Sequence, residues 1–158
     1  MKWSVLLCLL LAGCVTSYAP PENKTHPKIR FDMKNIKSLL FFEEGRDCSH
    51  AAKLESPHNP YLPGAKPLPV RGNKLMALQM TYANSRESCN VTMSFVPRFN
   101  HDYVVYNKLK FDQRRNISCS FKVIRKHRAA KQAQWKDEET VRIRKPVKAI
   151  KTDVRHCR

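Results

Sequence analysis

Three successive segments in the centre of the chain alternate apolar and polar residues with a period of two: residues 89–97, 103–111 and 117–123. Their apolar positions share one face of each segment: Cys89, Val91, Met93 and Phe95, then Tyr103, Val105, Leu109 and Phe111, then Ile117, Cys119, Phe121 and Val123. This period is typical of strands with one buried face. Residues 75–82 extend the pattern with Met76, Leu78, Met80 and Tyr82.

The joints at residues 98–101 and 113–116 are short enough for hairpin turns, so the pattern predicts an antiparallel meander. The apolar run 38–42 predicts another buried strand, and residues 140–144 predict one more, with Val141 and Ile143 inward. We therefore expect an all-β fold, a small antiparallel β-sandwich of immunoglobulin-like or related type. It would have disulfides and a basic C-terminal segment.

Two segments do not follow the strand pattern. Leu54–Val70 contains five prolines, which exclude helix and central strand and predict a long loop, either a binding element or weakly ordered. Residues 125–139 are rich in Lys, Arg, Ala and Gln, with Ala129, Ala130 and Ala133 at helical spacing. This composition favours a short surface helix or a basic loop.

The N-terminus has the order of a secretory signal, with Lys2, an apolar run Val5–Leu11, and then small residues. The run is too short to span a bilayer, which takes about 20 apolar residues. The sequence Leu11-Ala12-Gly13-Cys14 resembles the lipobox of bacterial lipoproteins. The resemblance implies that residues 1–13 are removed and that Cys14 receives a diacylglycerol and an N-acyl chain such as palmitate.

The same resemblance implies a lipidated tether at residues 14–28, where Pro20, Pro21 and Pro27 favour extended chain, and a single β-rich periplasmic domain at 29–158. Val15 after the lipidated cysteine suggests sorting to the outer membrane, with the domain facing the periplasm. The alternative is a freely secreted eukaryotic factor, cut after Ala19 and glycosylated at the sequons of Asn23, Asn90 or Asn116. Pro20, directly after that cut, disfavours it.

A second resemblance rests on Ser94-Phe95-Val96-Pro97, Asp102-Tyr103-Val104-Val105 and Ser118-Cys119-Ser120-Phe121. This pattern is similar to small uncharacterised bacterial envelope lipoproteins, over about Lys74 to Lys126. It implies an all-β domain and transfers no catalytic residue.

After loss of Cys8 and lipidation of Cys14, four cysteines remain: Cys48, Cys89, Cys119 and Cys157. An even set in an exported protein predicts two disulfides, with three possible pairings. A meander would separate Cys89 from Cys119 by about 9–10 Å, more than the roughly 7 Å that a disulfide allows. The pairs Cys48–Cys89 and Cys119–Cys157 are therefore preferred. No Cys-x-x-Cys pair is present, so no metal site is expected.

The net charge of +17 is concentrated toward the C-terminus, where thirteen Lys and Arg follow Phe121 against four Asp and Glu. Export argues against nucleic acid, so the expected partners are the membrane, through the N-terminal lipid, and anionic envelope polymers or a periplasmic protein. The candidate binding residues are Arg125, Lys126, Arg128, Lys131 and Trp135.

No nucleophile elbow, zinc-protease motif or glycine-rich phosphate loop occurs, and the six histidines are scattered. We therefore expect no catalytic residue, no cofactor and a non-enzymatic structural or interaction protein. The alternative within the envelope is an inhibitor or immunity lipoprotein that blocks a toxin or lytic enzyme through Leu54–Val70.

Overall fold

The computed structural model describes residues 18–33, 36–54, 66–83, 88–111, 117–130 and 133–145. Within these ranges the chain forms strands and no helix, so the prediction of an all-β sandwich is confirmed. The strands are β1 (Lys28–Asp32), β2 (Ser38–Glu44), β3 (Ser49–Lys53), β4 (Leu68–Pro69), β5 (Met76–Ala83), β6 (Ser88–Phe95), β7 (His101–Phe111), β8 (Ile117–His127), β9 (Lys136–Asp137) and β10 (Arg142–Arg144).

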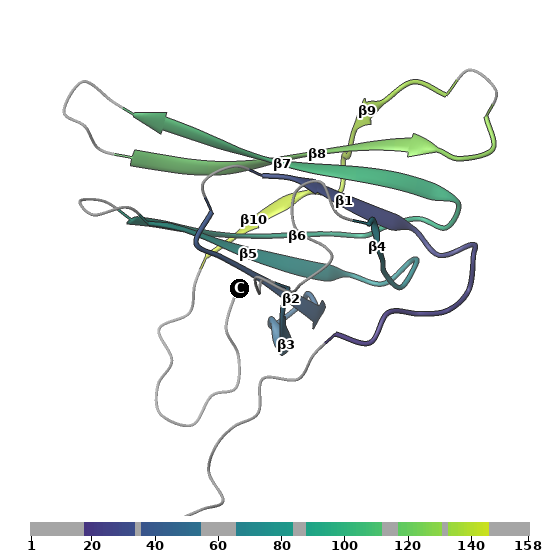
Figure 1. Cartoon of the computed structure of the whole chain (residues 1–158), viewed down its shortest axis with the longest axis horizontal. Helices are drawn as coiled ribbons and strands as arrows, with labels where there is room; N and C mark the ends of the chain where they lie inside the picture. The colour runs from purple at the N-terminus through teal and green to yellow at the C-terminus, as the bar shows by residue number, and fades with distance from the viewer. Residues whose placement is uncertain are drawn as a thin grey trace, which may run out of the picture.

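Two five-stranded sheets lie one above the other (Figure 1). The upper sheet has the order β4-β1-β7-β8-β9 and the lower sheet the order β10-β6-β5-β2-β3. All pairings are antiparallel except that of β1 with β7, which is parallel. The hairpin β7–β8 pairs along its full length, from His101↔His127 to Phe111↔Ile117.

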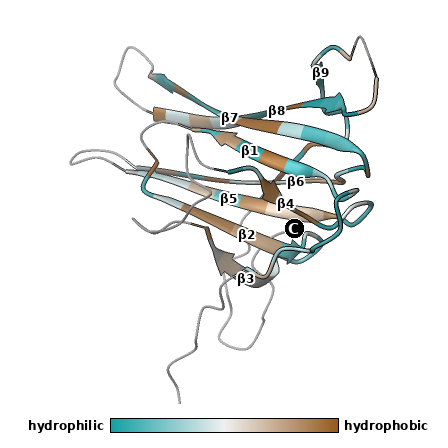
Figure 2. Cartoon of the chain, turned by 45° about the vertical axis from the view of Figure 1, so that its right-hand side comes forward, coloured by the Kyte–Doolittle hydropathy of each residue, from teal (hydrophilic) through white to brown (hydrophobic). Residues whose placement is uncertain are grey.

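The core lies between the sheets and is made by alternate residues, as the period of two predicts. Fully buried side chains come from both sheets and include Ile29, Leu39, Leu78, Met80, Met93, Phe95 and Tyr103. Figure 2 shows the same alternation as hydrophobic and hydrophilic bands along the strands. The inward position predicted for Ile143 is wrong. Its side chain is 58% exposed on the edge strand β10, although it pairs with the buried Met93.

The predicted meander is also wrong at one joint. The segment after β6 is not a hairpin turn: residues 96–100 carry the chain from the lower sheet to the upper one. Asn100 takes the left-handed conformation, with φ of 57°, which its short polar side chain tolerates. A short connection between two strands is compatible with a hairpin or with a crossing, and the sequence did not separate the two.

This crossing corrects the predicted disulfides. Because β6 and β8 lie in facing sheets, Cys89 and Cys119 oppose each other with Cα atoms 6.2 Å apart, and they form a disulfide that links the sheets. The pairs Cys48–Cys89 and Cys119–Cys157 are therefore wrong. Cys48 is buried and disulfide-bonded to a partner outside the described residues, and Cys157 itself lies outside them.

Other boundaries differ in detail. A short surface helix was one expectation for residues 125–139. Strand β8 instead continues to His127 and β9 follows, so the described part of this segment contains strand and turn. Strand β4, at the end of the proline-rich segment, is a sheet edge, where proline is tolerated. Residues 55–65 of that segment lie outside the described residues.

Replacing Cys89 and Cys119 together by Ala should lower the free energy of unfolding by about 3–4 kcal/mol, because the bond closes a loop of 30 residues in the unfolded chain. Urea unfolding followed by circular dichroism measures the change. A loss below about 1 kcal/mol would contradict the role of this bond as the link between the sheets.

Candidate functional site

Cations gather where β8 ends beside the crossing, and two hollows open there on opposite faces of the β7–β8 hairpin. The inner hollow, of about 400 Å³, is lined chiefly by Arg98, His101, Arg125, His127 and Lys136. The outer hollow, of about 320 Å³, is lined chiefly by Lys28, Arg30, Asp102, Lys126, Arg128 and Trp135. The two faces follow from strand alternation, since neighbouring residues of β8 point to opposite sides of the sheet.

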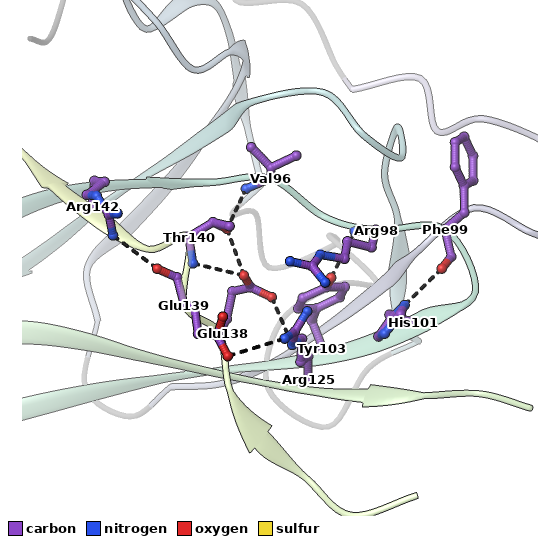
Figure 3. Close-up of polar contacts among 10 residues, drawn as sticks. All are labelled: Val96, Arg98, Phe99, His101, Tyr103, Arg125, Glu138, Glu139, Thr140 and Arg142. Atoms are coloured by element: carbon purple, nitrogen blue, oxygen red, sulfur yellow. Dashed lines mark hydrogen bonds and ion pairs between the residues drawn. The ribbon is translucent and has the colours of Figure 1, made fainter. Parts of the chain in front are cut away.

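A buried carboxylate, that of Glu138, holds Arg125 in place at the inner hollow (Figure 3). The side chain of Glu138 is fully buried; its Oε1 accepts hydrogen bonds from the Thr140 amide at 3.0 Å and the Thr140 hydroxyl at 2.7 Å. Its Oε2 makes no hydrogen bond but lies 3.5 Å from Nε of Arg125. A buried charge needs such a partner, so Arg125 is held at the wall of the hollow with much of its charge compensated.

Tyr103 connects this network to the crossing. Its hydroxyl accepts a hydrogen bond of 2.8 Å from the amide of Arg98. Burial is the largest effect on the Tyr103 phenol and raises its pKa. The hydrogen bond from the Arg98 amide lowers this pKa by less than burial raises it, and the negative charge of Glu138 adds a smaller increase. The phenol is therefore neutral at physiological pH and serves as a fixed acceptor.

Two histidines, His101 and His127, line the inner hollow. Nδ1 of His101 lies 2.8 Å from the carbonyl of Phe99, so in the neutral ring this nitrogen donates and Nε2 is left as an acceptor. The rings of His101 and His127, a cross-strand pair, meet edge to face with centroids 4.8 Å apart.

The outer hollow has the less compensated charge. Nζ of Lys126 lies 5.6 Å from the centroid of the Trp135 ring, a cation–π contact, and the Trp135 side chain is 43% exposed. Lys28 and Arg30 are exposed on the adjacent β1. Within the described part of the chain, no ion pair joins Lys28, Arg30 or Lys126 to a carboxylate. This hollow can therefore accept an anion beside an aromatic surface.

Arg128, by contrast, is committed to internal contacts. Its Nε donates to Asp102 at 3.0 Å, and its two terminal nitrogens donate to the carbonyls of Lys24 at 2.8 Å, His26 at 3.0 Å and His101 at 3.2 Å. The guanidinium thus fastens the segment before β1 to the β7–β8 hairpin. Arg128 is a structural residue at the edge of the site.

Four of the five predicted binding residues lie at this end, and the structure divides their roles. Lys126 and Trp135 face the outer hollow, Arg125 is held by Glu138, and Arg128 joins chain segments. Lys131 lies outside the described residues, as does Cys14.

Sequence reasoning missed four cations of the site: Lys28, Arg30, Arg98 and Lys136. The alternation Lys28-Ile29-Arg30-Phe31 was a usable signal, because it marks a strand with cations on its outer face.

A comparison with known family models, curated proteins and solved structures finds no match for this chain. Among the described residues, no three His, Cys, Asp or Glu side chains gather as they would to hold a metal ion. None of the described segments is a helix long and apolar enough to cross a membrane.

Substitutions of Arg128 and Lys126 test whether Arg128 is structural and Lys126 is not. Arg128→Gln should lower the free energy of unfolding by about 2–3 kcal/mol, because charge-assisted hydrogen bonds to four groups are lost. Lys126→Gln should change it by no more than about 0.5 kcal/mol. Urea unfolding measures both, and equal effects would refute the assignment of Arg128 as structural.

Proposed function

We propose that this protein is a lipid-anchored, non-enzymatic interaction protein of the bacterial envelope, whose basic end binds phosphate-bearing envelope components. The observation that carries the proposal is the outer hollow, where Lys28, Arg30 and Lys126 surround an exposed Trp135 without a described carboxylate partner. Because these cations stand on paired strands, their backbone positions are fixed before an anion binds. The aromatic ring adds contact area at low entropic cost.

The anchor in this proposal is Cys14, on the basis of Leu11-Ala12-Gly13-Cys14. The described chain contacts the domain from Tyr18 onward: its ring lies 4.5 Å from that of Phe41, and its hydroxyl donates to the carbonyl of Pro69 at 3.0 Å. Four residues after Cys14 span at most about 14 Å, so an anchored domain stays close to its membrane.

Intact mass of the protein purified from its natural membrane tests the anchor. We expect a mature chain that begins at Cys14 and carries a diacylglycerol and an N-acyl chain, and we expect Cys14→Ser to abolish the lipid mass. An unlipidated chain that begins near Pro20 would reject the anchor, and glycan mass on it would favour a secreted glycoprotein.

Titration of the mature protein with purified lipopolysaccharide, followed by Trp135 fluorescence, tests the binding site. The affinity should fall steeply with salt, and Arg30→Gln with Lys126→Gln should weaken it by about tenfold or more, since each cation near an anionic surface contributes about 1 kcal/mol.

The matched control is Arg46→Gln with Arg142→Gln, which removes the same charge at the β2–β3 turn and on β10. An equal loss in the control would show that only net charge matters and would reject the hollow as the site. No binding at low salt would reject the anion-binding function itself.

A further inference from the structure

The outward face of the upper sheet is broadly cationic. Alternation places Ile29, Phe31, Val105 and Val123 in the core, so the residues between them point away from it. The outward cations on β1, β7 and β8 are Lys28, Arg30, Lys108, Lys110, Lys122 and Lys126. The outward carboxylates on the same sheet are Asp32, Asp102 and Asp137, and two of them are engaged, Asp102 with Arg128 and Asp137 with Lys122 at 2.9 Å.

The lower sheet lacks this character. The outward residues of its strands β5 and β6 are uncharged, among them Gln79, Thr81, Asn90, Thr92 and Ser94. On the neighbouring β2, the outward Glu44 pairs with Lys74. The two arginines of the sheet, Arg142 and Arg144, lie on the edge strand β10. The described outward cations are therefore more numerous on the upper sheet than on the lower one.

Away from the outer hollow, where Val104 is buried, the cationic face is open: Lys108, Lys110 and Lys122 are exposed. No described segment covers the β1–β7–β8 surface apart from the chain around Trp135 (Figure 1). Along β7 it extends from the outer hollow at Asp102 to Lys110, eight residues or about 26 Å. Cations spread over that length match many separate phosphates in one plane better than a single small ligand.

We infer that this face docks on an anionic phospholipid bilayer, with Trp135 at the headgroup level and Lys108 and Lys110 against lipid phosphates. A juxtamembrane cation is attracted to anionic lipid, and tryptophan favours the membrane interface. The inference rests on the proposed lipid anchor. Arg128 holds the Lys24 carbonyl beside the hollow, and ten residues separate Lys24 from Cys14, so the hollow end of the face lies within about 35 Å of the anchor.

Depth-dependent quenching of Trp135 tests the docking. The only other tryptophan, Trp3, precedes the expected cut, so Trp135 is the single tryptophan of the mature chain. The lipidated protein is reconstituted into vesicles of phosphatidylcholine alone, or of phosphatidylcholine with phosphatidylglycerol, each with brominated acyl chains. Quenching should occur with phosphatidylglycerol only and should vanish at about 1 M salt, where the Debye length is about 3 Å.

The decisive variant is Lys108→Gln with Lys110→Gln, at the far end of the face from Trp135. Each lost charge should lower the ratio of docked to undocked protein about fivefold, so the double variant should lower it at least tenfold. The control variant, Arg46→Gln with Arg142→Gln, should leave quenching unchanged. Absent quenching, quenching equal in both lipid mixtures, or equal loss in the control variant would each overturn the docking.

The lipid anchor has its own readout: flotation with neutral vesicles at about 1 M salt, where surface charge is screened. Failure to float would reject the anchor. In that case, Trp135 quenching on added anionic vesicles still decides whether the face docks.

Discussion

The fold depends on how the chain crosses between its sheets at residues 96–100. Several backbone groups of this short segment bond to other parts of the chain: the amides of Val96, Arg98 and Asn100 donate to the Thr140 hydroxyl, the Tyr103 hydroxyl and the Thr25 carbonyl. The carbonyls of Pro97 and Asn100 accept from the amides of Asn73 and Arg128. Through these bonds the connection joins the following strand β7 to four segments that are more distant in sequence, at Thr25, Asn73, Arg128 and Thr140.

The basic end of the molecule is a consequence of that crossing. It brings Arg98 and His101 from one connection beside Arg125 and His127 of β8, and the Arg128 contacts then draw in the segment before β1 with Lys28 and Arg30. Like charges at such density repel one another, and the structure offsets part of the repulsion with one buried carboxylate, Glu138, and one half-buried carboxylate, Asp102. Among the described residues, the cations without an ion pair include Lys28, Arg30 and Lys126 of the outer hollow, and Arg98 and Lys136 of the inner one. Folding and charge compensation together select which basic residues remain available to a partner.

The strands were predictable because a strand with one buried face alternates apolar and polar residues in the sequence. Met76, Leu78 and Met80 in β5, or Phe121 and Val123 in β8, are buried as their alternation predicts. The choice of sheet was not predictable, because residues 98–101 contain nothing that distinguishes a hairpin from a crossing, and the disulfide pairing failed with it. The roles of Lys126 and Arg128 could not be separated either, because both lie in one basic stretch. Only the structure shows that Lys126 lines the outer hollow and that Arg128 joins distant chain segments.

Strand alternation also explains why binding and stability can be separated in this protein. Within β1, the apolar Ile29 and Phe31 serve the core while the cations Lys28 and Arg30, one position away, face solvent. A substitution at the outward positions changes the charge of the face without leaving a cavity or an unpaired buried group, which are the common causes of large destabilisation. Strands β5 and β6 of the lower sheet show that uncharged outward residues are compatible with the same core. The sandwich therefore does not require the cations of the upper sheet for its packing, and their concentration on one face supports a role in what that face meets.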